Sequence, residues 1–219
     1  MNAPEDVLAR QLERGTAALR LNLNAEQHAK LLAYVQLLVK WNQVYNLTAV
    51  RNPSDMITRH LLDSLAVAPF IKGPRVLDVG TGAGLPGIPL AIALPEFDFV
   101  LLDSVAKKTR FVVQATSELS LSNVVVNTQR VEKYQSLGLF DTVVSRAFSS
   151  ISEFVAVAGP LCRRSGGVLL AMKGRHPRDE LIALPAGYRL KSVTRITVPD
   201  LQEERHVVQL LRLNALETQ

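Results

Sequence analysis

The stretch Asp78-Val79-Gly80-Thr81-Gly82-Ala83-Gly84 separates a short apolar run from a segment with helical periodicity. The run before it, residues 75–79, suits a buried strand, and residues 87–94 have the apolar spacing of a helix. Three alternate glycines between a strand and a helix allow a tight turn at positive φ and let a ligand approach bare backbone. The stretch therefore predicts a ligand-binding loop at the carboxyl end of a parallel strand.

Short apolar runs continue to alternate with helical segments after this loop. Buried parallel strands are apolar on both faces, so the alternation predicts a doubly wound, mostly parallel α/β sheet. The last two runs flank Pro199-Asp200 and predict an antiparallel hairpin. The expected strands are Arg75–Val79, Phe97–Leu102, Val124–Asn127, Thr142–Ser145, Gly167–Met172, Tyr188–Val198 and Arg205–Leu213. The expected helices among them are Gly87–Leu94, Lys107–Leu119 and Ile151–Arg163.

The first third of the chain has a helical pattern. Asn24 is a good N-cap, and apolar residues follow it at helical spacing. Pro53 suits the first turn of a second helix, and a third helix is expected over Arg59–Phe70. With the break at Gly73-Pro74, the sequence predicts a helical cap over residues 1–72 and a ligand-binding domain over residues 73–219.

Composition bounds the setting of the protein. The 219 residues are 47% hydrophobic and 21% charged, which is typical of a globular protein with a sizeable core. Cys162 is the only cysteine, so the chain can form neither an internal disulfide nor a thiolate metal cluster. The start of the chain carries acidic residues where a signal peptide needs basic ones, and no apolar stretch is long enough to span a membrane. We expect a cytoplasmic monomer without a metal or a membrane partner.

A second carboxylate ends the next predicted strand, 25 residues after Asp78. This residue, Asp103, is placed to accept hydrogen bonds from both hydroxyls of an adenosine ribose. Bonds to a charged acceptor contribute about 1.5–3 kcal/mol each, so Asp103→Ala should weaken ligand binding at least tenfold. We expect Asp103→Ala to change the thermal transition of the ligand-free protein little.

The glycine spacing favours one of two adenosine cofactors. Dinucleotide folds prefer G-x-G-x-x-G, and Leu85 occupies the place of its third glycine. The string D-x-G-x-G-x-G is instead similar to the first motif of class I methyltransferases, which bind S-adenosylmethionine. A P-loop sequence is absent. S-adenosylmethionine is therefore the favoured cofactor, and a nicotinamide cofactor is the alternative.

Several longer strings together resemble the RsmG (GidB) family. They are residues 41–48 (WNQVYNLT), 59–64 (RHLLDS), 78–90 (DVGTGAGLPGIPL), 102–104 (LDS) and 145–148 (SRAF). The resemblance implies a class I, Rossmann-like enzyme that methylates N7 of one guanine in the decoding-region loop of bacterial 16S ribosomal RNA. The RNA partner is either free or within the small ribosomal subunit or its precursor.

The resemblance also implies particular cofactor contacts. Gly80 and Leu85 match the cofactor loop, Val131 and Glu132 match the adenine site, and Arg146 follows the fourth strand. An ordinary helix start is the alternative reading of Val131-Glu132. With the loop and ribose arguments, the predicted cofactor-binding set is Asp78, Gly80, Gly82, Gly84, Leu85, Asp103, Val131, Glu132 and Arg146.

Basic residues indicate a surface for RNA. The net charge is +5, and residues 163–191 alone hold seven Lys/Arg against two acids. The predicted RNA-binding residues are Arg59, His60, Lys173 and Arg175. A solvated face is the alternative for the basic stretch, and a surface ion pair between Arg59 and Asp63, at i and i+4, is the alternative for Arg59.

Two aromatic residues lie at helical spacing in the predicted cap. Trp41 and Tyr45 could stack on bases, but packing of the cap onto the sheet is favoured. Guanine N7 carries a lone pair and no proton, so we expect no general base and assign no catalytic residue. The alternatives to a methyltransferase are a nicotinamide-dependent oxidoreductase and a non-catalytic RNA-binding ribosome-assembly factor.

Overall fold

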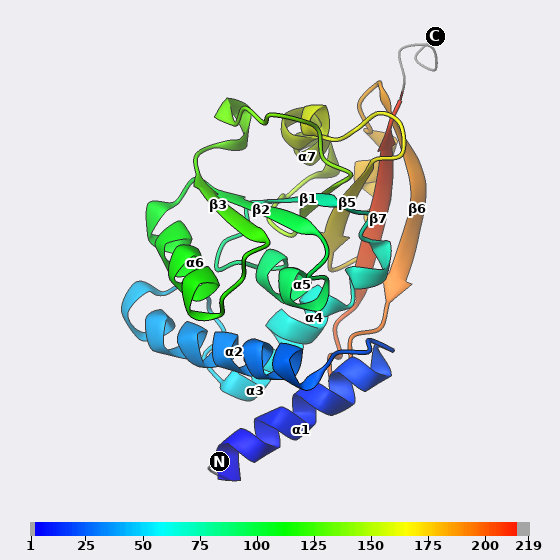
Figure 1. The fold of residues 1–219 in the computed structure, drawn as a ribbon. Coiled ribbons are helices and arrows are strands. Elements are labelled where there is room, and N and C mark those ends of the chain that lie inside the picture. Colours follow the sequence, from blue (N-terminus) through cyan, green and yellow to red (C-terminus); the bar gives the residue numbers. More distant parts are fainter. Residues whose placement is uncertain (1–2, 214–219) are drawn as a thin grey trace.

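Seven strands form one sheet in the computed structural model, which describes residues 3–213. The strand order is β3-β2-β1-β4-β5-β7-β6 (Figure 1). The first five strands are parallel, and β7 runs antiparallel to both β5 and β6. The strands are β1 (Arg75–Val79), β2 (Asp98–Asp103), β3 (Val124–Thr128), β4 (Thr142–Ser145), β5 (Val168–Lys173), β6 (Tyr188–Ile196) and β7 (Arg205–Arg212). The predicted mostly parallel sheet and its antiparallel hairpin are therefore confirmed.

The chain reverses its direction of winding at the centre of the sheet. It runs outward from β1 through β2 to β3, and then returns to place β4 on the other side of β1. In doubly wound sheets, ligands bind in the crevice at the carboxyl ends of the strands at such a reversal. The glycine loop after β1 and Arg146 after β4 both lie at this point.

Helices cover both faces of the sheet (Figure 1). The helices α5 (Gly87–Ala93) and α6 (Ala106–Glu118) lie on one side, and α7 (Ile151–Ala158) lies on the other. Successive residues of β1 enter different apolar cores, Val76 with the first pair of helices and Leu77 with α7, as the pleat requires. The helix expected over Ile151–Arg163 ends early and continues as the 3-10 turn η4 (Gly159–Leu161), where Pro160 offers no N–H.

The N-terminal third is helical, as predicted, but its last part is irregular. Helix α1 (Ala3–Ala18) precedes α2 (Ala25–Tyr45), which starts with the predicted N-cap Asn24 in a capping box with Gln27. Pro53 begins α3 (Pro53–Met56), also as predicted. The single helix expected over Arg59–Phe70 is wrong. This part consists of a π-helix η1 (Ile57–Leu62), a short α4 (Asp63–Leu65) and a 3-10 turn η2 (Ala68–Phe70).

The N-terminal helices and the sheet share one apolar core. Leu12 of α1 and Leu38 of α2 belong to the same buried cluster as Val76 of β1. Trp41 stacks on Tyr45 at a centroid distance of 5.1 Å and lies 5.7 Å from Phe111 of α6. These contacts favour the packing role for Trp41. None of the helices between residues 3 and 213 is long and apolar enough to cross a membrane.

Candidate functional site

The glycine loop uses its three glycines in different ways. All three have positive φ, +71° at Gly80, +60° at Gly82 and +91° at Gly84, a backbone conformation that residues with a Cβ rarely adopt. A Cβ on Gly80 would lie 2.7 Å from the Cβ of Ala147, and one on Gly84 would strike Ile88 of α5. A Cβ on Gly82 would meet only the carbonyl oxygen of Gly80, at 4.0 Å. Gly82 therefore presents bare backbone to open space, whereas Gly84 is needed for helix packing.

Asp78 holds the loop from behind and does not reach the open side. Its side chain is fully buried, and its Oδ2 accepts hydrogen bonds from the Thr81 hydroxyl at 2.7 Å and from the Gly87 N–H at 2.8 Å. Burial raises the pKa of the Asp78 carboxyl to about 6, and the two hydrogen bonds oppose this shift. The structure thus places Asp78 where it supports the loop rather than where it would contact a ligand.

Asp103 ties the second strand to the same loop. Its Oδ2 accepts the Gly82 N–H at 2.9 Å, and its Oδ1 accepts the Val105 N–H at 2.8 Å. Each carboxylate oxygen has a further lone pair, but Asp103 is only 7% exposed and is not in the lining of the cavity over the loop. Because the carboxylate orders two backbone amides, the expectation that Asp103→Ala leaves the ligand-free protein unchanged needs revision.

A cavity of about 200 Å³ opens over the loop. Its lining includes Gly80, Gly82, Leu85 and Arg146, together with Thr48 and His60 from the N-terminal third. The buried Tyr34 hydroxyl of α2 donates to the Ala83 carbonyl at 2.7 Å and so fixes the loop to the cap. The cavity therefore lies between the sheet edge and the cap.

His60 forms a neutral part of this wall. Its Nε2 lies 2.9 Å from the Thr48 hydroxyl, and the residue is only 6% exposed. Burial, with the nearby Arg146 guanidinium, lowers the pKa of His60 to about 4. The imidazole is therefore uncharged at neutral pH.

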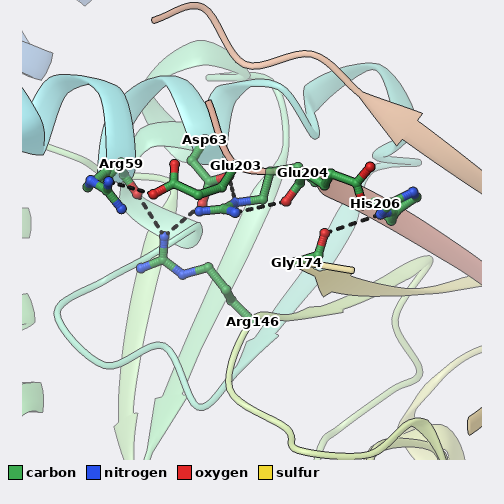
Figure 2. A network of polar contacts seen from close by, with 8 residues as sticks. Arg59, Asp63, Arg146, Gly174, Glu203, Glu204 and His206 are labelled. Atoms are coloured by element: carbon green, nitrogen blue, oxygen red, sulfur yellow. Dashed lines mark hydrogen bonds and ion pairs between the residues drawn. The ribbon is translucent and has the colours of Figure 1, made fainter. Parts of the chain in front are cut away.

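Arg146 stands where this cavity meets two others. It also lines a cavity of about 350 Å³, with Arg59 and Arg205, and a third of about 470 Å³, with Lys173 and Arg175. Its Nη1 donates to the buried Asp63 at 3.2 Å and to the Arg59 carbonyl at 3.3 Å (Figure 2). The three cavities thus form one cleft along the carboxyl edge of the sheet.

The hypothesis of a surface ion pair between Arg59 and Asp63 is wrong. Asp63 is 2% exposed and pairs instead with Arg146 and with Arg205, whose Nε donates at 2.9 Å. Arg59 pairs with Glu203 at 2.6 Å (Figure 2). No local sequence pattern indicates these partners, because Asp63 and Arg205 are 142 residues apart.

The two remaining RNA candidates differ in their surroundings. The Lys173 ammonium donates to the Ser149 carbonyl at 3.0 Å and to Glu180 at 2.8 Å, and its side chain is 11% exposed. Arg175 is exposed, and its side chain has no hydrogen-bond or ion-pair partner within residues 3–213. Arg175 is therefore available to a ligand, whereas Lys173 is occupied within the fold.

Val131 and Glu132 lie apart from the cavity over the loop. They begin the 3-10 turn η3 (Val131–Lys133) after β3, so the alternative of a helix start describes their local structure. Neither is in the lining of the cavity over the glycine loop. They do follow a parallel strand at the same carboxyl edge as Asp103, with Asp103 beside Thr128 in the register.

These residues fit an adenosine cofactor. The loop offers open backbone at Gly82, and the Asp103 carboxylate adjoins it with free lone pairs. Solved structures with this fold include the O-methyltransferase TomG from Streptomyces achromogenes in complex with SAM (15% identity, TM-score 0.58, 90% of this chain and 94% of that one). TrmN from Thermus thermophilus also matches (20% identity, TM-score 0.56, 72% and 53%). The fold is that of the class I, Rossmann-like methyltransferases.

Sequence comparison narrows this class to one family. The GidB family model, described as rRNA small subunit methyltransferase G, matches residues 27–208. The ribosomal RNA small subunit methyltransferase G of Nitrosococcus oceani is 53% identical over 199 residues, which cover 91% of this chain and 92% of that protein. The protein of the same name from Vibrio vulnificus is 49% identical over 192 residues, 88% and 91% of the two chains. The chain belongs to the GidB family of rRNA small subunit methyltransferases.

Proposed function

We propose that this protein transfers a methyl group from S-adenosylmethionine to N7 of a guanine in 16S ribosomal RNA. The observation that carries the proposal is the open backbone of Gly82 beside the Asp103 carboxylate, in a chain of the GidB family. The protein is an S-adenosylmethionine-dependent rRNA methyltransferase. When bound, the cofactor supplies a methyl group on a positively charged sulfur.

Residues at the ends of the first, second and fourth strands would hold the cofactor. Asp103 would accept the ribose hydroxyls, while the loop backbone from Gly80 to Leu85 lies against the rest of the molecule. Val131 and Glu132 remain our candidates for the adenine side, because they follow the third parallel strand. Asp78 and Gly84 contribute by shaping the loop.

The chain's role in the reaction is placement rather than proton transfer. Guanine N7 needs no base to remove a proton, so orientation of the acceptor in line with the methyl group can carry the rate enhancement. His60 and Arg146 line both the loop cavity and the adjoining cavity, and they would therefore stand between the cofactor and the RNA. A neutral His60 and an Arg146 held by Asp63 give this boundary a fixed shape.

The same proposal includes the domain organisation, the oligomeric state and the partners of the protein. We propose that residues 1–72 act as a cap over the site and that residues 73–219 form the methyltransferase domain. The chain would work as a monomer in the cytoplasm, without a metal, on 16S rRNA that is free or within the small ribosomal subunit or its precursor. Arg59 and Arg175 would contact RNA phosphates.

The experiment measures cofactor choice and RNA choice separately. Calorimetric titration with S-adenosylmethionine should give binding, and titration with NADH should give none. Incubation with methyl-labelled cofactor should then label unmodified 16S rRNA and leave 23S rRNA unlabelled. Tight NADH binding without a response to S-adenosylmethionine would support the oxidoreductase alternative. Cofactor and RNA binding without label transfer would support an assembly factor.

A further inference from the structure

Three arginines from distant parts of the chain line the cavity next to the glycine-loop cavity. They are Arg59 of η1, Arg146 after β4 and Arg205 at the start of β7. Arg146 and Arg205 share the carboxylate of Asp63, at 3.2 and 2.9 Å. Arg59 is paired with Glu203, which belongs to the connection between β6 and β7 (Figure 2).

The two carboxylates differ strongly in exposure. The Asp63 side chain is 3% exposed, whereas the side chains of Glu203 and Arg59 are 45% and 43% exposed. Breaking a buried pair leaves an uncompensated charge in the interior, so Asp63 keeps its partners. An exposed pair contributes little net stability and is screened by salt. The Arg59–Glu203 pair is therefore the member of this network that can be exchanged.

Glu203 offers Arg59 the same contacts that a phosphate would offer. A guanidinium binds carboxylate and phosphate oxygens with the same donor geometry. The guanidinium of Arg59 also lowers the pKa of the Glu203 carboxyl, so the pair is charged at neutral pH. Arg59 lines the cavity that adjoins the glycine-loop cavity, so under the proposed function a phosphate bound to Arg59 would lie next to the cofactor site.

We infer that the Glu203 carboxylate occupies the Arg59 guanidinium in the free protein and is displaced by a phosphate of the RNA substrate. In the free protein its carboxylate neutralises Arg59, and a backbone phosphate of the bound ribosomal RNA takes its place. This inference rests on the proposed function, since it requires that the cleft binds RNA. Glu203 then lowers the affinity of the protein for RNA in general. Arg59 binds only those RNA molecules whose phosphate displaces the Glu203 carboxylate.

The exchange has a signature in the salt dependence of binding. A phosphate that binds a free arginine releases a counterion, which contributes about 0.7–0.9 to the slope of log K against log salt concentration. A phosphate that displaces Glu203 leaves an unpaired carboxylate beside the RNA, and its negative charge offsets part of the charge that Arg59 neutralises. Removing the Glu203 charge should therefore steepen the slope, by at most about 0.7–0.9. It should also tighten binding by about two- to fivefold at low salt.

The test compares Glu203→Gln with Glu204→Gln. Glu204 is a neighbouring residue of the same type and of similar exposure (48%), but its side chain pairs with Arg195 at 3.4 Å, outside the cavity. Both variants change the net charge equally. Binding of a fluorescein-labelled 16S rRNA transcript is measured by anisotropy over a range of KCl concentrations. The same measurement on Arg59→Gln and on the double variant with Glu203→Gln shows whether the effect depends on Arg59.

The expected result is a steeper slope and tighter binding for Glu203→Gln only when Arg59 is present, with no change of slope for Glu204→Gln. Equal behaviour of the two glutamine variants, or the same effect of Glu203→Gln without Arg59, overturns the inference. Methyl transfer by the unaltered protein is measured in parallel. If it proceeds while the two variants behave alike, only the inference fails. If the protein neither binds nor methylates 16S rRNA, the proposed function fails as well.

Discussion

Asp103→Ala tests the ribose contact and the loop together. The carboxylate accepts the N–H groups of Gly82 and Val105, and we propose that its remaining lone pairs accept the ribose hydroxyls. Loss of one charged hydrogen bond to a ribose hydroxyl costs about 1.5–3 kcal/mol, which is about a 10- to 150-fold weaker Kd. The two backbone amides also lose their acceptor. The ligand-free protein should therefore be destabilised by about 1–3 kcal/mol, unlike the expectation from sequence alone.

Two measurements and one control separate these effects. Calorimetry with S-adenosylmethionine gives the Kd, and thermal unfolding of the ligand-free protein gives the stability change. Asp98→Ala is the control, because Asp98 is an exposed acid at the opposite end of the same strand. It should leave the Kd unchanged. An unaltered Kd in Asp103→Ala would remove Asp103 from the cofactor site and refute the ribose argument.

Four further variants test the support of the loop. Burial raises the pKa of Asp78 to about 6, so the folded chain holds this proton more tightly than the unfolded chain, and the resulting stability is full below about pH 4 and lost as pH rises through about 6. From below pH 4 to pH 7, the unfolding free energy of the wild type in denaturant titrations should fall by about 3 kcal/mol more than that of Asp78→Asn. The same pH dependence of unfolding free energy in both proteins would contradict this. Gly82→Ala should weaken cofactor binding in calorimetry with a modest loss of stability. Gly84→Ala should mainly lower Tm, because its Cβ would strike Ile88 of α5. The reverse pattern would refute the roles given to the two glycines. Tyr34→Phe leaves the Ala83 carbonyl without its donor and should cost about 1–3 kcal/mol of stability and several-fold in Kd, whereas an unchanged Kd would separate the cap from the cofactor loop.

Local patterns were enough to predict the sheet and its loop. The apolar runs that end at Val79 and Ser145 are strands because they are buried on both faces, whereas their pairing in the sheet came from the structure. The N-cap at Asn24 was likewise predicted from the sequence, whereas its capping box with Gln27 came from the structure. Each of these features is set by residues within a few positions of one another.

The contacts around Arg146 could not be predicted in this way. The pairing of Asp63 with Arg205 depends on how the start of β7 lies against α4, and no local periodicity encodes that contact. The π-helix over Ile57–Leu62 was also missed, because its apolar spacing differs little from that of an α-helix. The exposed Glu203 has no distinguishing sequence pattern, and only its distance to Arg59 draws attention to it.

We propose that this cleft delivers a methyl group to guanine N7 of 16S rRNA. The most direct measurement incubates the protein with S-adenosylmethionine labelled in its methyl group and small ribosomal subunits that lack the modification. The RNA is then digested to nucleosides for mass spectrometry. Labelled 7-methylguanosine is the predicted product. Label in any other nucleoside, or none in the RNA of the small subunit, would contradict the account.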